Sequence, residues 1–310
     1  MELYSAEAKA IGAQVQEWLE HPDYELESTF GDKGVVDATT FITVAKRLRA
    51  KGFTALPQED RLTITTKEHV RFTLSGLGVI SAYCRDDVLA GKPYTAVIKD
   101  RAAGTSTVDL DEYGVRIKNR RELPMAADDA EVKKLLEQWD RVPKAFRMIR
   151  RWSFEGEGAV FDLSIVRSTK KDLRGDYRWQ RRFRDQDIMA AAPSYEIEVE
   201  LRRVAGDDAT AAMKRLVRNV GEVLRGIQKN SVLIRASTRQ KVLGAYKELT
   251  GTDLFRGPAP RTLQKKNFMK QREEGEDNIR DGYNVTDKAD GLRCLGFCDK
   301  KGELFLIDMS

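Results

Sequence analysis

Residues 194–201 read SYEIEVEL, in which glutamates alternate with apolar residues. This period of two predicts a β-strand, because successive side chains in a strand point to opposite faces of a sheet. Glu196, Glu198 and Glu200 therefore share one face, and apolar residues share the other. For one strand alone, a polar face turned toward water is the simpler interpretation.

A second stretch, residues 23–30 (DYELESTF), repeats the pattern with Glu25 and Glu27. Like charges that oppose one another on neighbouring strands repel. A divalent cation between them would turn that repulsion into attraction, and Mg²⁺ or Mn²⁺ prefers carboxylate oxygens. The two stretches together therefore indicate a cation site held by oxygen ligands.

Strand-like stretches dominate the first 250 residues. Eight are expected, at 23–30, 61–66, 69–75, 94–101, 113–122, 146–154, 159–168 and 194–203. Helices are expected at 5–20, 37–51, 77–86, 128–139, 208–228 and 237–249. Eight strands are enough to close a barrel. The predicted fold class is α+β: an eight-stranded antiparallel β-barrel, or tunnel, with a polar lumen and surrounding helices.

Basic residues also recur on shared faces inside the predicted strands. They are Arg71, Lys99, Arg101, Arg116, Lys118, Arg120, Arg147 and Arg151. Each one alone is compatible with a solvated face. Together they indicate acidic strands that face basic strands across an enclosed space. Such a lumen suits a polyphosphate, because Arg and Lys bind phosphate oxygens and a carboxylate-bound metal ion can bridge to them.

The composition excludes several other classes of site. Two histidines and three cysteines among 310 residues leave no disulfide framework, and they argue against a zinc site or a histidine-based nucleophilic triad. No apolar run is long enough to span a bilayer, and the first residues do not form a secretory signal. The net charge of +5 permits a nucleic-acid partner without demanding one.

The order of the strand motifs carries a family resemblance over residues 20–205. The motifs are YELESTFG, HVRFTL, TAVIKDR, GVRIKNRRELP, RRWSF, VFDLSIVRS and YEIEVEL. They resemble the N-terminal RNA triphosphatase domain of viral and fungal mRNA capping enzymes, in the triphosphate tunnel metalloenzyme superfamily. The similarity is closest to the capping enzymes of large DNA viruses. It implies a tunnel, a Mg²⁺ or Mn²⁺ cofactor, and hydrolysis of the γ-phosphate of 5′-triphosphate RNA to give 5′-diphosphate RNA.

The resemblance also implies roles for individual residues. The residues at the metal-binding positions are Glu25, Glu27, Glu196 and Glu198. The residues at phosphate-facing positions are Arg71, Lys99, Arg116 and Lys118. Glu122 falls where a carboxylate could orient the attacking water, and Arg151 and Asp162 fall at the later basic and acidic positions. Two departures, Ile149 and Arg167 where relatives show lysine, put the basic wall near residues 147–167 in doubt.

A second motif lies near the C-terminus. Residues 288–293 (KADGLR) match the K-x-D-G-x-R motif of covalent nucleotidyltransferases, in which the lysine forms a phosphoramidate with the nucleotide. The preceding GPAPRTLQ resembles the linker that enters viral guanylyltransferase domains. The expected organisation is a triphosphatase domain over 1–250, a linker over 251–282 and the start of a guanylyltransferase domain over 283–310. Lys288 is expected to act only in a longer capping enzyme.

Other functions stay open at this point. One alternative is a fragment of a polynucleotide-ligase-type nucleotidyltransferase with an unrelated N-terminal domain. Another is a non-catalytic platform that binds polyphosphate, and a third is a hydrolase of thiamine triphosphate or inorganic triphosphate. The expected partners are 5′-triphosphate RNA, nucleoside triphosphates and a methyltransferase domain or subunit, with no membrane. The resemblance implies a location in the host cytoplasm, at the viral factory, or in the virion.

Overall fold

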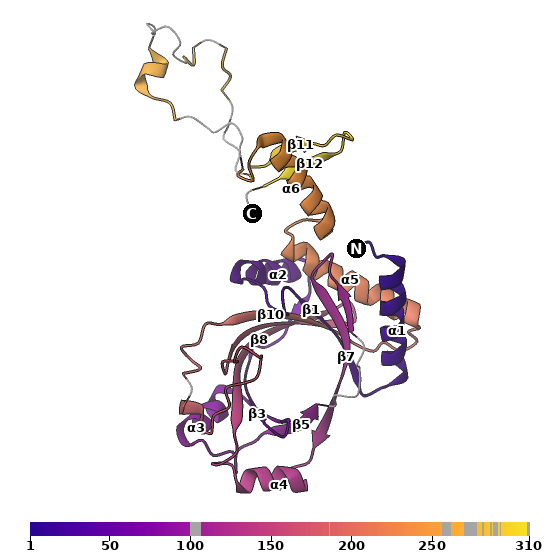
Figure 1. Ribbon diagram of the computed structural model, residues 1–310, viewed down its shortest axis with the longest axis vertical. Coiled ribbons are helices and arrows are strands. Elements are labelled where there is room, and N and C mark those ends of the chain that lie inside the picture. Colours follow the sequence, from indigo (N-terminus) through magenta and orange to yellow (C-terminus); the bar gives the residue numbers. More distant parts are fainter. Residues whose placement is uncertain are drawn as a thin grey trace. The chain divides into compact units, whose positions relative to one another are not determined.

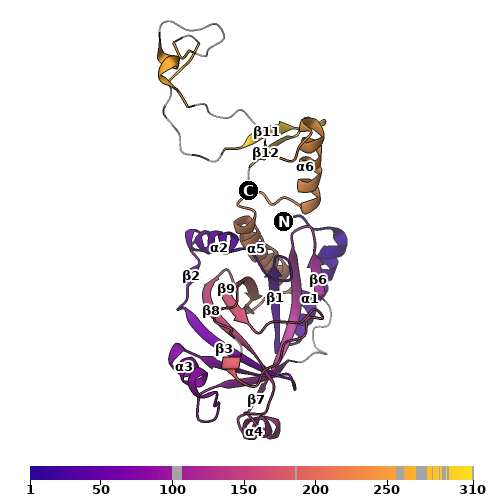
Figure 2. The ribbon, with the colours of Figure 1, turned by 60° about the vertical axis from the view of Figure 1, so that its left-hand side comes forward.

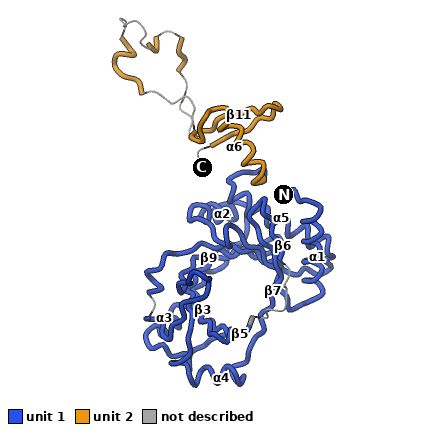
Figure 3. Tube along the Cα trace, in the orientation of Figure 1, with its two compact units in different colours: residues 1–234 blue, residues 235–310 orange. Residues whose placement is uncertain are grey.

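The computed structural model describes most of the chain. The described residues are 1–99, 107–185, 187–255, 262–269, 278–280, 282–285, 287, 291 and 293–308. They form two compact units, residues 1–234 and residues 235–310 (Figure 3). Each unit is considered by itself.

Eight antiparallel strands close into a barrel in the described part of the first unit (Figure 1). In chain order they are β1 (Tyr24–Phe30), β3 (Glu59–Thr66), β4 (Val70–Ser75), β5 (Thr95–Lys99), β7 (Val115–Met125), β8 (Lys144–Gly156), β9 (Ala159–Ser168) and β10 (Ser194–Leu201). Around the ring the order is β1, β10, β9, β8, β3, β4, β5 and β7, and the pairing of β7 with β1 closes it. The predicted fold class is confirmed, and each of the eight expected stretches is a strand of the ring.

Two short strands extend the sheet and were not expected from the sequence. β2 (Thr54–Ala55) pairs with β8, and β6 (Thr107–Leu110) pairs with β7. Two and four residues are too few to show a reliable alternation of apolar and polar side chains. Their pairing with a longer neighbour, rather than their own pattern, makes them strands.

Helices cover the outside of one half of the barrel. α1 (Ser5–Glu20), α2 (Ala38–Ala50) and α5 (Ala209–Ile227) pack against β1, β10 and one another (Figure 2). Their apolar stripes meet the apolar faces of the strands in a core that includes Val15, Val44, Leu216, Leu26 and Ile197, all fully buried. The apolar faces of the strands therefore point outward, under the helices, and the glutamate faces point into the barrel.

A second core covers the other half of the barrel. α3 (Leu77–Asp86) and α4 (Ala130–Glu137) pack on the outer faces of β3, β4 and β8 together with the short 3₁₀ helix η1 (Phe183–Asp185). Phe72 contacts Trp139 edge to face, with ring centroids 5.2 Å apart, and Phe146 meets Phe183 in the same way. Through Phe183, η1 anchors the segment between β9 and β10 to the barrel.

The second unit contains α6 (Ala236–Thr250), the 3₁₀ helix η2 (Lys265–Phe268) and an antiparallel hairpin of β11 (Leu295–Cys298) and β12 (Leu304–Ile307). Tyr246 of α6 packs edge to face on Phe297 of β11. The helix over 237–249 was expected in the first domain and lies in the second unit, while the functional domain boundaries remain a prediction. In the described residues of both units, no helix is long and apolar enough to cross a membrane.

Candidate active site

A cavity of about 1080 Å³ lies inside the barrel, and all eight strands of the ring contribute to its lining. Among the described residues, ten acidic and eight basic side chains line it. The lumen is polar because the alternate, apolar residues of each strand are turned outward under the helices. An enclosed space with this charge density needs ionic partners, either its own or those of a ligand.

One wall of the cavity is acidic. The strand register places Glu27 of β1 directly opposite Glu200 of β10, and Glu198 opposite Asp162 of β9. Burial raises the pKa of Glu27 above its ordinary value, and the negative charge of Glu198 adds to the rise. Burial likewise raises the pKa of Glu25, with the charges of Glu200 and Glu122 as further causes. The fold thus holds these carboxylates where their negative charge is costly.

The pKa of Glu196 and that of Glu200 are also raised, in each case chiefly by burial. For the basic residue Lys118, burial lowers the pKa, and the neighbouring charge of Arg120 lowers it further. These four glutamates and Lys118 are therefore less readily charged than they would be in water. A bound ion of opposite charge would relieve each group.

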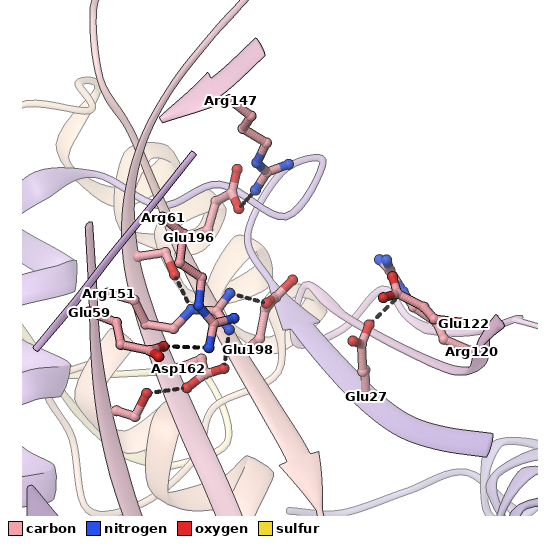
Figure 4. A network of polar contacts seen from close by, with 12 residues as sticks. Glu27, Glu59, Arg61, Arg120, Glu122, Arg147, Arg151, Asp162, Glu196 and Glu198 are labelled. Carbon is pink, nitrogen blue, oxygen red and sulfur yellow. Dashed lines mark hydrogen bonds and ion pairs between the residues drawn. The ribbon is translucent and has the colours of Figure 1, made fainter. Parts of the chain in front are cut away.

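Arginines partner the acidic wall (Figure 4). Arg120 Nε lies 2.5 Å from Glu27 Oε2, and Arg147 forms an ion pair with Glu196. Arg151 contacts two carboxylates, since its Nη1 donates to Asp162 and its Nη2 to Glu198.

A separate ion pair joins Arg71 of β4 to Glu122 of β7, with 2.6 Å between Nη1 and Oε1. Both side chains are about a quarter exposed, so a ligand in the cavity can reach them. This pair places a cation and a carboxylate side by side on the wall opposite β9 and β10.

The structure brings ten of the predicted site residues together around this cavity. They are Glu25, Glu27, Arg71, Arg116, Lys118, Glu122, Arg151, Asp162, Glu196 and Glu198. Arg116 lies at the rim, where Asp109 binds it at 2.7 Å and its side chain is 55% exposed. Lys99 is opposite Glu122 in the strand register, and its side chain is outside the described residues. Lys288 also lies outside them. The individual roles of all these residues remain predictions.

Sequence reasoning missed Arg61, which lines the cavity from β3 and ion-pairs with Glu59. Arg61 is the direct register partner of Ile149 in β8, the position where the sequence resemblance implied a lysine. The guanidinium of Arg61, on the neighbouring strand, therefore supplies a positive charge to this part of the wall. The alternation of Arg61 with Thr63 and Thr65, which also line the cavity, was the available signal.

Tyr177 was missed for a different reason. It lines the cavity from the segment between β9 and β10, whose own sequence shows no regular pattern. Only the folding of that segment back onto the start of β8 brings the ring to the lumen.

The donor chemistry of the acidic wall fits a hard divalent cation, because its ligating atoms are carboxylate oxygens. Glu27 Oε2 is buried and, despite its short distance to Arg120 Nε, accepts no aligned hydrogen bond within the described residues. However, no three or more His, Cys, Asp or Glu side chains of the described residues lie close enough together to hold a metal ion. Metal binding would therefore require the glutamates to exchange arginine partners for the cation.

Comparison with known proteins identifies the fold but does not assign the chain to a family. No family model and no curated protein matches the chain. Among solved structures, the RNA triphosphatase domain of a trifunctional mimivirus mRNA capping enzyme is similar, with a TM-score of 0.51 and 14% identity over 73% of this chain and 100% of that one. A monoclinic structure of the mimivirus capping enzyme triphosphatase has a TM-score of 0.52, with 15% identity over 74% and 100% of the two chains. The fold is a tunnel barrel. At this identity the likeness establishes the fold alone.

Proposed function

We propose that this chain is a metal-dependent RNA 5′-triphosphatase that releases the γ-phosphate of 5′-triphosphate RNA and leaves 5′-diphosphate RNA. The observation that carries the proposal is the closed barrel whose cavity sets an acidic wall against basic side chains. The likeness in fold to two structures of the mimivirus capping enzyme triphosphatase supports the same activity. The reaction needs positioning and neutralisation of charge more than covalent help, and the lumen supplies both.

The basic side chains would hold the triphosphate. Arg71, Lys118 and Arg151 line the cavity, and guanidinium groups bind phosphate oxygens in a fixed geometry. Arg71 and Arg151 are paired with carboxylates at present, so the phosphate oxygens would compete with those carboxylates for the same donors. This competition favours the most highly charged ligand, a triphosphate over a monophosphate.

Glu25, Glu27, Glu196 and Glu198 would hold the metal ion, which when bound supplies positive charge to the phosphate oxygens. Glu122 would accept a hydrogen bond from the attacking water. Its ion pair with Arg71 places that carboxylate beside a phosphate-binding group. The oxygen of the water would form a bond to the γ-phosphorus while the bond from that phosphorus to the bridging oxygen breaks. The water would pass its proton to the Glu122 carboxylate, and the 5′-diphosphate RNA would leave.

The capping context belongs to the same proposal. The K-x-D-G-x-R match at 288–293 supports a guanylyltransferase domain in a longer protein, with Lys288 as its nucleophile. Such a protein would act in mRNA capping in a large DNA virus, together with a methyltransferase domain or subunit, in the host cytoplasm or the virion. The lysine lies outside the described residues, so the sequence motif is its whole support.

The test is release of phosphate from RNA labelled on the γ-phosphate, with Mg²⁺, with Mn²⁺ and with EDTA. Wild type is compared with Glu25→Ala and Glu198→Ala, and circular dichroism verifies that each variant is folded. We expect metal-dependent release that both substitutions reduce at least about 100-fold. Wild type that binds inorganic tripolyphosphate but releases nothing with either metal would identify a non-catalytic platform instead. Release that neither substitution affects would refute the assignment of the metal-binding glutamates.

A further inference from the structure

A basic arm stands at one end of the barrel. We use this name for residues 170–182, KKDLRGDYRWQRR, which connect β9 toward η1 and carry six basic and two acidic side chains. The arm begins as a small hairpin, because the Asp172 and Arg178 amides donate to the carbonyls of Asp176 and Lys170. Gly175 turns the tip with φ of +87°, a conformation that glycine adopts without strain. The arm therefore has a defined backbone.

Its two acidic residues leave the cations largely uncompensated. Asp172 accepts hydrogen bonds from the Arg174 and Asp176 amides, so its carboxylate is engaged within the tip. The basic side chains that have no acidic partner in the described part of the chain are those of Lys170, Lys171, Arg174, Arg181 and Arg182, and all five residues are exposed. A row of exposed cations of this kind attracts a polyanion.

Aromatic rings lie among these cations. Tyr177 and Trp179 meet edge to face, with ring centroids 5.6 Å apart, and both are half-buried. Lys171 Nζ lies 5.1 Å from the centre of the Tyr177 ring. The Tyr177 ring also lines the tunnel cavity. Interleaved cations and aromatic rings are the chemistry that binds single-stranded nucleic acid, since phosphates meet the cations and bases stack on the rings.

The strand register shows which end of the barrel carries the arm. Arg147 near the start of β8 pairs with Ser168 at the end of β9, so these two strand ends lie together. Lys144 and Gln180 exchange two backbone hydrogen bonds of 2.6 and 2.9 Å, which hold the arm against this end. A chain that leaves the cavity past Tyr177 therefore runs directly along the arm.

The opposite end of the barrel carries acidic side chains and arginines that are already engaged. Arg121 is paired with Asp23, and Arg218 with Glu157. Arg202 is paired with Glu200, and Arg203 donates to the backbone carbonyls of Trp18 and His21. These arginines are therefore less available to a polyanion than the exposed cations of the arm.

We infer that the basic arm binds the first unpaired nucleotides of an RNA whose 5′-polyphosphate lies in the tunnel, with Tyr177 stacking on a base at the mouth. The inference rests on the proposed function for the position of the triphosphate. It goes beyond that function in naming the end through which RNA enters. It also names the residues that distinguish RNA from a free triphosphate, which cannot reach the arm and the acidic wall together.

The test measures binding of a fluorescent single-stranded RNA of about a dozen nucleotides, with a 5′-hydroxyl or a 5′-triphosphate, in EDTA. The variants are the charge reversal Arg174→Glu/Arg181→Glu, the ring deletion Tyr177→Ala and the ring-preserving Tyr177→Phe. The matched control is Lys133→Glu/Lys134→Glu, the same charge change on exposed residues of α4. Circular dichroism verifies that each variant is folded.

We expect the arm charge reversal to weaken binding of both RNAs at least about tenfold and to reduce the slope of log affinity against log salt by about two. Tyr177→Ala should weaken binding about tenfold, and Tyr177→Phe should restore it, because stacking needs only the ring. The α4 control should bind as wild type does. In turnover, KM for 5′-triphosphate RNA should rise in the arm variants by a larger factor than KM for inorganic tripolyphosphate.

Arm variants that bind RNA no more weakly than the α4 control would overturn the inference. So would a wild type that binds polyglutamate as tightly as RNA, because the arm would then be a surface for an acidic protein. The 5′-hydroxyl RNA separates the two proposals. If wild type releases no phosphate while the arm variants still lose affinity for this RNA, the proposed function fails and the arm remains an RNA-binding element.

Discussion

Arg151 is the residue on which the acidic wall depends most visibly. Its guanidinium donates to Asp162, to the Ser164 hydroxyl at 3.0 Å and to Glu198, and its side chain is only 16% exposed. Ser153 donates to the second oxygen of Asp162. A substitution at Arg151 therefore leaves two enclosed carboxylates without their counter-charge.

We expect Arg151→Gln to lower the rate of phosphate release at least about 100-fold, because a charged donor to the phosphate is lost. The free energy of unfolding should fall by about 1–3 kcal/mol, since the carboxylates lose their hydrogen bonds. The matched control is Arg150→Gln, one residue earlier. Arg150 points outward, where it pairs with Asp60 and is half exposed. Steady-state turnover measures the rate, and urea unfolding measures the stability. Equal effects of Arg151→Gln and Arg150→Gln would contradict the assignment of Arg151 to the active site.

Glu27 offers a test with opposite signs for activity and stability. Burial raises its pKa above the ordinary value, so the folded state binds this proton more tightly than the unfolded state does. The charged form therefore destabilises the metal-free protein at neutral pH, and that penalty fades as the pH falls through the raised pKa. Glu27→Gln should accordingly raise the melting temperature at pH 7 in EDTA, with a smaller gain at pH 5. Phosphate release should drop at least about 100-fold. A lower melting temperature at pH 7 would show that the Arg120 ion pair outweighs the burial of charge.

At the scale of elements, the helices that cover the barrel make its lumen polar. α5 crosses α2 at a close contact, where a Cβ on Gly226 would lie 2.8 Å from Val44 Cγ2 and 3.0 Å from Val44 Cα. Gly12 in α1 is also helical, but a Cβ there meets nothing within 4 Å. The two glycines therefore separate the helical preference of alanine from the packing of one helix on another.

We expect Gly226→Ala to lower the free energy of unfolding by about 1–3 kcal/mol, because the α2–α5 contact is overpacked. Gly12→Ala should raise it by about 0.5–1 kcal/mol, because alanine favours the helix and reduces the freedom of the unfolded chain. Urea unfolding followed by circular dichroism measures both. A stabilising Gly226→Ala would mean that α2 and α5 are not in close contact.

The elements also show how far sequence patterns reach. All eight ring strands were predictable, because alternation in SYEIEVEL or HVRFTL survives in a strand of six to eight residues. β2 and β6 were not predictable, because two and four residues are too few to show a periodic pattern. Arg61 is evident in the sequence, but its pairing with Ile149 is not. That pairing depends on the register between β3 and β8, which no local pattern encodes.

The first unit is built around a closed ring of strands, and closure places carboxylates from β1, β9 and β10 in one space. A cation bound only by the folded state stabilises the fold by mass action, by about 2.7 kcal/mol at 100 times its dissociation constant. Because protons compete for glutamates whose pKa values are raised, cation binding should weaken as the pH falls.

We therefore expect Mn²⁺ or Mg²⁺ to raise the melting temperature at pH 8 relative to EDTA, with a smaller rise at pH 5.5. The double substitution Glu25→Gln/Glu198→Gln should abolish the rise at both pH values. Differential scanning calorimetry gives this readout without any turnover. A metal-dependent rise that persists in the double variant would place the cation elsewhere in the chain.

The sequence by itself determined where the eight ring strands lie and which of their residues share a charged face, because both follow from a period of two along the chain. It also determined that any metal ligands would be oxygens, since histidine and cysteine are scarce. The polar lumen was predicted, but only the tertiary structure shows how it arises, because helices cover the apolar faces and the charged faces turn inward. The same holds for the pairing of Arg120, Arg147 and Arg151 with the glutamates, and for the basic arm at the mouth. Those contacts join residues far apart in the chain, and their distances are set by strand register and barrel closure rather than by local sequence.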